Sequence, residues 1–157
     1  MPVAIGTRSS RGQPDAGFAG MSSEITGPDA TARRRLAGAR ITLLPPQGYL
    51  EMLGLIGQAR LVLTDSGGIQ EETTALAVAC LTMRENTERP ITVEQGTNTL
   101  VGRNRARTLD CVDEILRNGG KRGRTPELWD GHAAERIADD LSAWLGLSAL
   151  DRKVVHA

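Results

Sequence analysis

The chain has 157 residues, of which 39% are hydrophobic, so it is long enough to bury the core of one globular domain. Its 19 basic and 19 acidic residues balance, which excludes a general nucleic-acid or acidic-membrane binder, because such proteins need excess lysine and arginine. There is no run of ~20 apolar residues for a membrane span and no signal-peptide core. Cys80 and Cys111 have no metal-type spacing. We therefore expect a cytoplasmic protein with reduced thiols and with neither a metal nor another cofactor.

The N-terminal segment differs in composition from the rest of the chain. Residues 1–30 are rich in Gly, Ser, Pro, Asp and Arg without a sustained period, which predicts a disordered tail. We expect one ordered domain over residues 31–147 and a second tail over residues 148–157. The first predicted strand, near 41–44, ends at Pro45 because proline has no N–H group for the ladder.

Helical and strand patterns alternate along the rest of the domain. Apolar residues at i, i+4 and i+7 predict the helices, and short apolar runs predict the strands. Gly119 is expected to end the helix predicted near 105–118. This alternation is typical of an α/β fold in which right-handed crossovers join the strands of a parallel sheet. After the first strand we predict helices near 49–60, 69–77, 105–118 and 132–147 and strands near 61–65, 80–83 and 98–101.

Two expectations follow about packing. In the last helix, Ile137, Leu141 and Trp144 share one face, so we expect Trp144 to pack in the core rather than to form a stacking surface. Four short parallel strands make a thin sheet, and the strand near 41–44 has no predicted partner on its outer side. An open edge of this kind predicts poor stability or self-association, which size-exclusion chromatography would detect.

The run from Leu61 to Glu72 reads as a strand, a Ser66-Gly67-Gly68 turn and a helix that opens with acidic residues. A helix N-terminus presents unpaired N–H groups, and glycines let a ligand oxygen approach the backbone, so the turn can hold a phosphate. The alternative is an ordinary strand-to-helix turn. Glu72 lies one helical turn further on and can accept hydrogen bonds from ribose hydroxyls. Alternatively, it only complements the helix dipole.

Five segments of the sequence resemble the non-hydrolysing UDP-N-acetylglucosamine 2-epimerases, in the same order and spacing over about residues 31–147. The segments are Leu43–Leu50, Leu63–Glu72, Thr87–Pro90, Glu94–Asn98 and Asp130–Ile137. The resemblance implies an enzyme of the GT-B type, in which two Rossmann-like domains face each other across a cleft, and it matches part of the second, C-terminal domain. In this family C2 of the sugar is inverted by elimination of UDP and its re-addition, while the second domain holds UDP.

The resemblance also implies which residues bind UDP. It places Gln47 and Met52 by the uracil and Glu72 on the ribose. It places the Ser66-Gly67-Gly68 turn on the diphosphate and adds Arg89 at a further nucleotide-binding position. Asn86, Thr87 and Asn98 are expected to brace loops instead of contacting the ligand. The alternative for the arginine is an ion pair with Glu85 or Glu88. The implied UDP-binding residues are Gln47, Met52, Ser66, Gly67, Gly68, Glu72 and Arg89.

Three departures from the family pattern affect these expectations. Met52 stands where some members have an aromatic ring, and Leu76-Ala77-Val78-Ala79 replaces a common Leu-Gly-x-Pro, so the helix stop is poorly specified. The catalytic groups of the first domain have no counterpart, so no catalytic residue is predicted.

The resulting hypothesis is the UDP-binding half of a UDP-GlcNAc to UDP-ManNAc epimerase that is inactive alone. It would bind UDP-GlcNAc or UDP, with a separately encoded first domain or a second copy as partner. The alternatives are the UDP-sugar-binding lobe of a GT-B glycosyltransferase and a non-functional truncated gene product.

Overall fold

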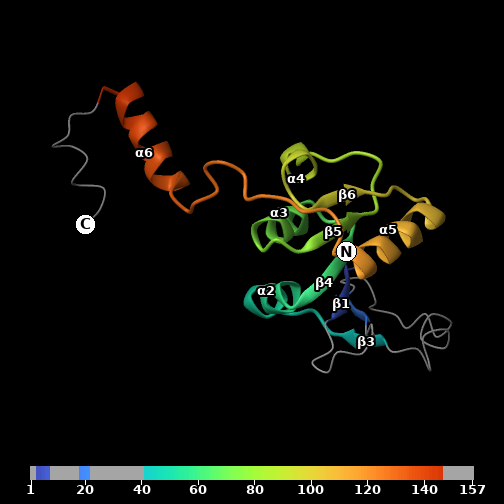
Figure 1. Cartoon of the computed structure of the whole chain (residues 1–157). Coiled ribbons are helices and arrows are strands. Elements are labelled where there is room, and N and C mark those ends of the chain that lie inside the picture. Colours follow the sequence, from blue (N-terminus) through green and yellow to red (C-terminus); the bar gives the residue numbers. More distant parts are fainter. Residues whose placement is uncertain (1–2, 8–17, 22–40, 147–157) are drawn as a thin grey trace. The chain divides into compact units, whose positions relative to one another are not determined.

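The computed structural model describes residues 3–7, 18–21 and 41–146 (Figure 1). The chain divides into two units, residues 1–125 and 126–157. The described strands are β1 (Val3–Thr7), β2 (Phe18–Met21), β3 (Ile41–Leu44), β4 (Ala59–Thr64), β5 (Ala79–Thr82) and β6 (Asn98–Leu100). The described helices are α2 (Tyr49–Gly57), α3 (Gly67–Ala75), α4 (Pro90–Glu94), α5 (Arg105–Asn118) and α6 (Ala133–Trp144), and none of them is long and apolar enough to cross a membrane.

The strands form one sheet in the order β3-β2-β1-β4-β5-β6. Strands β4, β5 and β6 are parallel, with Leu61 opposite Ala79 and Cys80 opposite Asn98. Helix α3 connects β4 to β5 as the β-α-β pattern predicts. The α/β fold expected from the sequence is therefore confirmed.

The other side of the sheet differs from the prediction. Strand β1 is antiparallel to both β2 and β4, and β2 is parallel to β3, so two strands separate β3 from β4. Both β1 and β2 come from the segment expected to be a disordered tail, so that expectation is not met for these residues. Their short, glycine-containing sequences give a weak strand signal, whereas pairing satisfies backbone groups that the neighbouring strands would leave open. Self-association through the outer edge of β3 stays a prediction.

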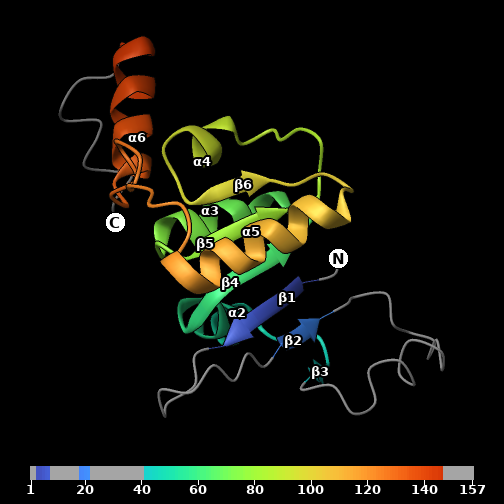
Figure 2. The ribbon, with the colours of Figure 1, turned by 45° about the vertical axis from the view of Figure 1, so that its right-hand side comes forward.

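Helices cover both faces of the parallel strands. Successive residues of β4 point to opposite faces, Leu61 to one and Val62 to the other. Figure 2 shows α5 on one side of the sheet and α2 and α3 on the other. The buried cluster under α2 and α3 consists of Met52, Ile56, Ala59, Val62 and Val78. The cluster under α5 consists of Leu61, Ala79, Leu81, Val101 and Ile115.

Helix α5 is capped at both ends, and its C-terminal cap is the glycine that the sequence predicts. The side chain of Asn104 accepts a hydrogen bond from the Arg107 backbone N–H at 3.0 Å. At the other end Gly119 has φ 84°, a left-handed conformation in which its N–H donates to the Ile115 carbonyl at 2.9 Å. The bounds 105–118 and the glycine stop are confirmed.

The end of α3 contains a backbone conformation that its sequence does not favour. Ala77 has φ 55°, in the left-handed region where a Cβ is unfavourable. We therefore expect Ala77→Gly to stabilise the protein by about 1 kcal/mol and to raise its melting temperature by a few degrees. Ala75→Gly is the matched control, because it places a glycine at the last helical residue of α3, where φ is not positive, and should destabilise by up to about 1 kcal/mol. Thermal unfolding of both variants tests this, and a loss of stability in Ala77→Gly would contradict it.

Helix α6, in the second unit, does not meet the packing expectation. The exposed fractions are 59% for Ile137, 53% for Leu141 and 82% for Trp144, and α6 has no buried residue. Within its unit, the described residues include no second helix or strand to cover this apolar face. The spacing of the three residues predicted the helix correctly, but it could not supply a partner surface.

The start of α6 is fixed by a carboxylate. Asp130 pairs with both terminal nitrogens of Arg136, at 3.0 Å for Nη1–Oδ1, and accepts from the His132 backbone N–H at 3.0 Å. The Arg136 contact first, and the His132 contact second, lower the pKa of Asp130 from 3.8 to about 2.

Because the folded pKa is depressed, the stabilisation is present above the ordinary pKa of 3.8 and is lost as the pH falls through about 2. Carboxyl NMR should give a pKa of about 2 for Asp130, and Arg136→Gln should raise it toward 3.8. Titration near 3.8 in the unmodified protein would contradict this pairing.

Candidate functional site

The Ser66-Gly67-Gly68 turn lies where β4 passes into α3. Thr64 ends β4, and Ser66 is the N-cap residue of α3 with extended backbone angles. The Ser66 backbone N–H donates to Thr64 Oγ1 at 3.0 Å, which fixes the turn. The Ser66 side chain makes no capping hydrogen bond. Its hydroxyl and the first N–H groups of α3 therefore form a small donor cup, as the sequence predicts.

The two glycines of the cup face open space. A Cβ on Gly68 would meet no atom within 4 Å, and one on Gly67 would meet only Glu88 Oε2, at 3.8 Å. Neither glycine has a positive φ. The protein's own packing therefore does not require glycine at either position. Open space beside glycines at a helix N-terminus lets a ligand oxygen approach the backbone N–H groups.

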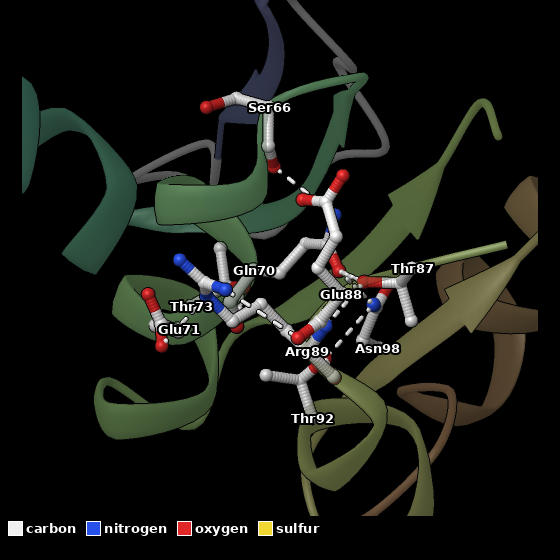
Figure 3. A network of polar contacts seen from close by, with 9 residues as sticks. All are labelled: Ser66, Gln70, Glu71, Thr73, Thr87, Glu88, Arg89, Thr92 and Asn98. Atoms are coloured by element: carbon white, nitrogen blue, oxygen red, sulfur yellow. Dashed lines mark hydrogen bonds and ion pairs between the residues drawn. The ribbon is translucent and has the colours of Figure 1, made fainter.

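A buried polar network supports the cup from behind (Figure 3). Gln70 is fully buried, and its Nε2 donates to the Ser66 carbonyl at 3.2 Å. Its Oε1 accepts from Thr87 Oγ1 at 2.6 Å and from Asn98 Nδ2 at 3.0 Å. Asn98 also donates to Thr92 Oγ1 at 3.1 Å. One side chain of α3 thus links the cup to the loop after β5, to α4 and to β6, and the contacts of Thr87 and Asn98 agree with the loop-bracing role expected for them.

Arg89 is held beside α3 by its backbone and by an ion pair. Its N–H donates to Thr87 Oγ1 at 3.0 Å, and its carbonyl accepts from Thr92 Oγ1 at 2.7 Å. The guanidinium Nε lies 3.0 Å from Glu71 Oε1, at an angle that gives an ion pair without a hydrogen bond. The alternative partner predicted for Arg89 was Glu85 or Glu88, whereas the structure pairs it with Glu71. Both side chains are about 40% exposed, so the pair is weak and a ligand can compete for it.

Glu72 is the third acidic group close to the cup. It is half-buried in α3, and burial raises the pKa of its carboxyl, with a smaller contribution from the charge of Glu71. A raised pKa means that the ionised carboxylate lacks compensating donors in the ligand-free protein. Two ribose hydroxyls would supply such donors.

The fold and the sequence match proteins of one family. The family model described as UDP-N-acetylglucosamine 2-epimerase matches residues 22–142. The chain belongs to this family. The expected family is therefore confirmed, and the match favours an isomerase family over the glycosyltransferase alternative.

Individual members of the UDP-N-acetylglucosamine 2-epimerase family show the extent of the likeness. The enzyme of Methanocaldococcus jannaschii is 48% identical over 98 residues, which cover 62% of this chain and 26% of that protein. The Escherichia coli K12 enzyme is 41% identical over 106 residues, which cover 64% and 28%. The chain thus spans between a quarter and a third of the length of these relatives.

Solved structures of family members have the same fold as the chain. The M. jannaschii enzyme in complex with UDP-GlcNAc and UDP is 43% identical with a TM-score of 0.62, over 72% of this chain and 31% of that one. The S. aureus MnaA–UDP co-structure is 30% identical with a TM-score of 0.67, over 78% and 35%. These structures confirm the GT-B-type α/β architecture expected from the resemblance.

The two residues that the family resemblance places by the uracil have contacts within the protein itself. Gln47 follows β3 and donates through Nε2 to the Pro45 carbonyl at 2.7 Å. Met52 is 8% exposed and belongs to the core cluster with Ile56, whereas Tyr49, at the start of α2, is 66% exposed. Core packing alone explains why Met52 is buried, and no ligand is needed for it. Contact of Gln47 or Met52 with uracil stays a prediction.

Proposed function

We propose that the chain binds UDP and serves as the UDP-binding half of a UDP-N-acetylglucosamine 2-epimerase. The observation that carries this proposal is the open cup at Ser66, Gly67 and Gly68, which offers unpaired donors to a diphosphate. Arg89 lies on the neighbouring loop and can turn from Glu71 to a phosphate oxygen, because guanidinium groups bind phosphate in a bidentate manner. The likeness to family structures that contain UDP supports the same ligand.

In this proposal Glu72 accepts hydrogen bonds from the two ribose hydroxyls. Glu72→Gln removes a charged acceptor, so we expect UDP binding to weaken by about 1.5–3 kcal/mol, or roughly tenfold to a hundredfold. Binding of 2′,3′-dideoxy-UDP should be the same for both proteins, because it has no diol. Calorimetric titration of both ligands tests this, with Glu114→Gln on the exposed surface of α5 as control. An equal loss for both ligands would contradict the ribose assignment.

The same variant should make the ligand-free protein more stable. A carboxyl with a raised folded pKa contributes stability below its unfolded pKa, and this contribution is lost as the pH rises through the folded pKa. At neutral pH the ionised Glu72 therefore disfavours the fold, and Glu72→Gln removes that effect. Thermal unfolding near pH 7 and again near pH 4 should show the gain at the higher pH only.

We further propose that these 157 residues do not invert C2 by themselves. Abstraction of the C2 proton needs an available base within hydrogen-bond reach, and departure of the diphosphate needs an acid or cation. The segments that match the family pattern supply proposed nucleotide-binding positions and include no counterpart of these catalytic groups. The missing groups would come from another domain or from a second copy. Interconversion of UDP-GlcNAc and UDP-ManNAc by the purified chain would contradict this proposal.

A further inference from the structure

A cavity lies on the β6 side of the sheet, in the first unit. Its volume is about 450 Å³, and its walls are β6 with the turn after it, the loop that follows β5, helix α4, the first turn of α5 and the segment that follows α5. No residue assigned to UDP binding lines it. The cavity is large enough for a small-molecule ligand, since such sites measure about 300–1,000 Å³.

The walls of the cavity carry an excess of positive charge. Arg84, Arg107 and Lys121 line it together with one acidic residue, Glu85, so the formal excess is two positive charges. The Glu85 carboxylate is turned toward the start of α5, where Oε1 accepts from the Arg103 backbone N–H at 3.3 Å. The surrounding protein therefore leaves the cations of this cavity only partly neutralised.

The two cations flanking β6 differ in how firmly they are held. Arg84 has an ion pair with Glu88 at 3.5 Å, but both side chains are exposed, and pairs of this kind contribute little. Lys121 is fixed, because its ammonium group donates to the carbonyls of Val93 and Asn98, the latter at 3.3 Å. An ammonium group has three donors, so one is left for a ligand. Burial lowers the pKa of Lys121, and a bound anion would offset that cost.

We propose that this cavity binds a phosphate monoester, such as a sugar phosphate, as its dianion. The charge of a phosphate monoester near neutral pH, about −1.5 to −2, matches the excess on the walls. Arginine forks are suited to phosphate oxygens, and Arg84 and Arg107 provide two of them on separate elements. The volume leaves room for the organic part of the molecule beside the phosphate. This site is independent of the proposed UDP site, and neither proposal rests on the other.

Calorimetric titration of the full chain with glucose 6-phosphate, in phosphate-free buffer of low ionic strength, tests this site. We expect saturable binding with one ligand per chain, and no binding of neutral glucose. Arg107→Gln should weaken the binding about tenfold or more, because it removes a charged contact to the phosphate. Arg105→Gln is the matched control, since it removes the same charge from the same helical turn but does not line the cavity. It should change the dissociation constant by less than about twofold.

Arg107 and Arg105 are exposed, and thermal unfolding of each variant will show that the fold is retained. Arg84→Gln provides a second variant and should weaken binding in the same way. The proposal would be overturned if glucose 6-phosphate gave no saturable binding. It would also be overturned if Arg105→Gln and Arg107→Gln weakened binding equally, because the effect would then reflect net charge and no particular site.

Discussion

Replacing Gly68 with alanine is expected to leave the fold intact, or slightly more stable, and to weaken UDP binding. In the ligand-free protein the added methyl group meets no atom within 4 Å, and the backbone is helical without a positive φ. Alanine also reduces the conformational freedom of the unfolded chain, which stabilises the protein by about 0.4–1 kcal/mol. The methyl group would, however, occupy the space proposed for the diphosphate. Overpacking of this kind costs about 1–3 kcal/mol, so the dissociation constant should rise about tenfold.

Gly54→Ala is the matched control for this prediction. Gly54 lies in the middle of α2, and a Cβ at this position also meets no atom within 4 Å. This variant should gain a similar stability and should bind UDP as the unmodified protein does. Thermal unfolding and calorimetric titration of both variants separate the two effects. If Gly68→Ala bound UDP with unchanged affinity, the diphosphate would not lie against this turn.

The largest expected loss of stability comes from Gln70→Ala. This change removes the acceptor of Thr87 Oγ1 and of Asn98 Nδ2 and the donor to the Ser66 carbonyl. Buried polar groups that lose their partners cost about 1–3 kcal/mol each, and Asn98 keeps its contact with Thr92. We therefore expect a loss of about 2–4 kcal/mol in the free energy of unfolding, measured with chemical denaturant. UDP binding should weaken as well, because the turn loses its support.

Gln58→Ala is the control for the network. Gln58 is exposed, and its only side-chain hydrogen bond among the described residues is to the Gly54 carbonyl at 3.3 Å. Removal of this side chain should change the free energy of unfolding by less than about 0.5 kcal/mol. Equal effects of the two glutamine substitutions would mean that the buried network does not stabilise the fold.

The parts of the fold that local sequence determines could be predicted. The strand, turn and helix from Leu61 to Ala75 follow from a contiguous apolar run and a glycine pair, and α5 follows from its apolar period and its Gly119 stop. The strands β1 and β2 could not be predicted, because short glycine-containing segments acquire a strand conformation only when open sheet edges are available to pair with them. The outcome for Trp144 has a similar cause. Its helical period shows that one face is apolar, but not what covers that face.

The candidate site likewise has one part that could be predicted from the sequence and another that could not. The cup could be predicted because Ser66, Gly67 and Gly68 are adjacent in the sequence and the chemistry of a helix N-terminus is local. The role of Gln70 could not, since its partners Thr87 and Asn98 lie 17 and 28 positions away. The buried residues of α3, Gln70, Thr73 and Thr74, are all polar, so no apolar period marks the inward face of this helix. The Glu71–Arg89 pair depends in the same manner on the path of the loop after β5.

The central claim is that this chain holds UDP at the start of α3. Calorimetric titration of UDP into the purified chain, together with thermal unfolding in the presence of UDP, tests it most directly. We predict saturable binding of one UDP per chain and a melting temperature that rises with UDP concentration, because a ligand that binds only the folded state stabilises it. No heat of binding and no shift in melting temperature at millimolar UDP would contradict the claim.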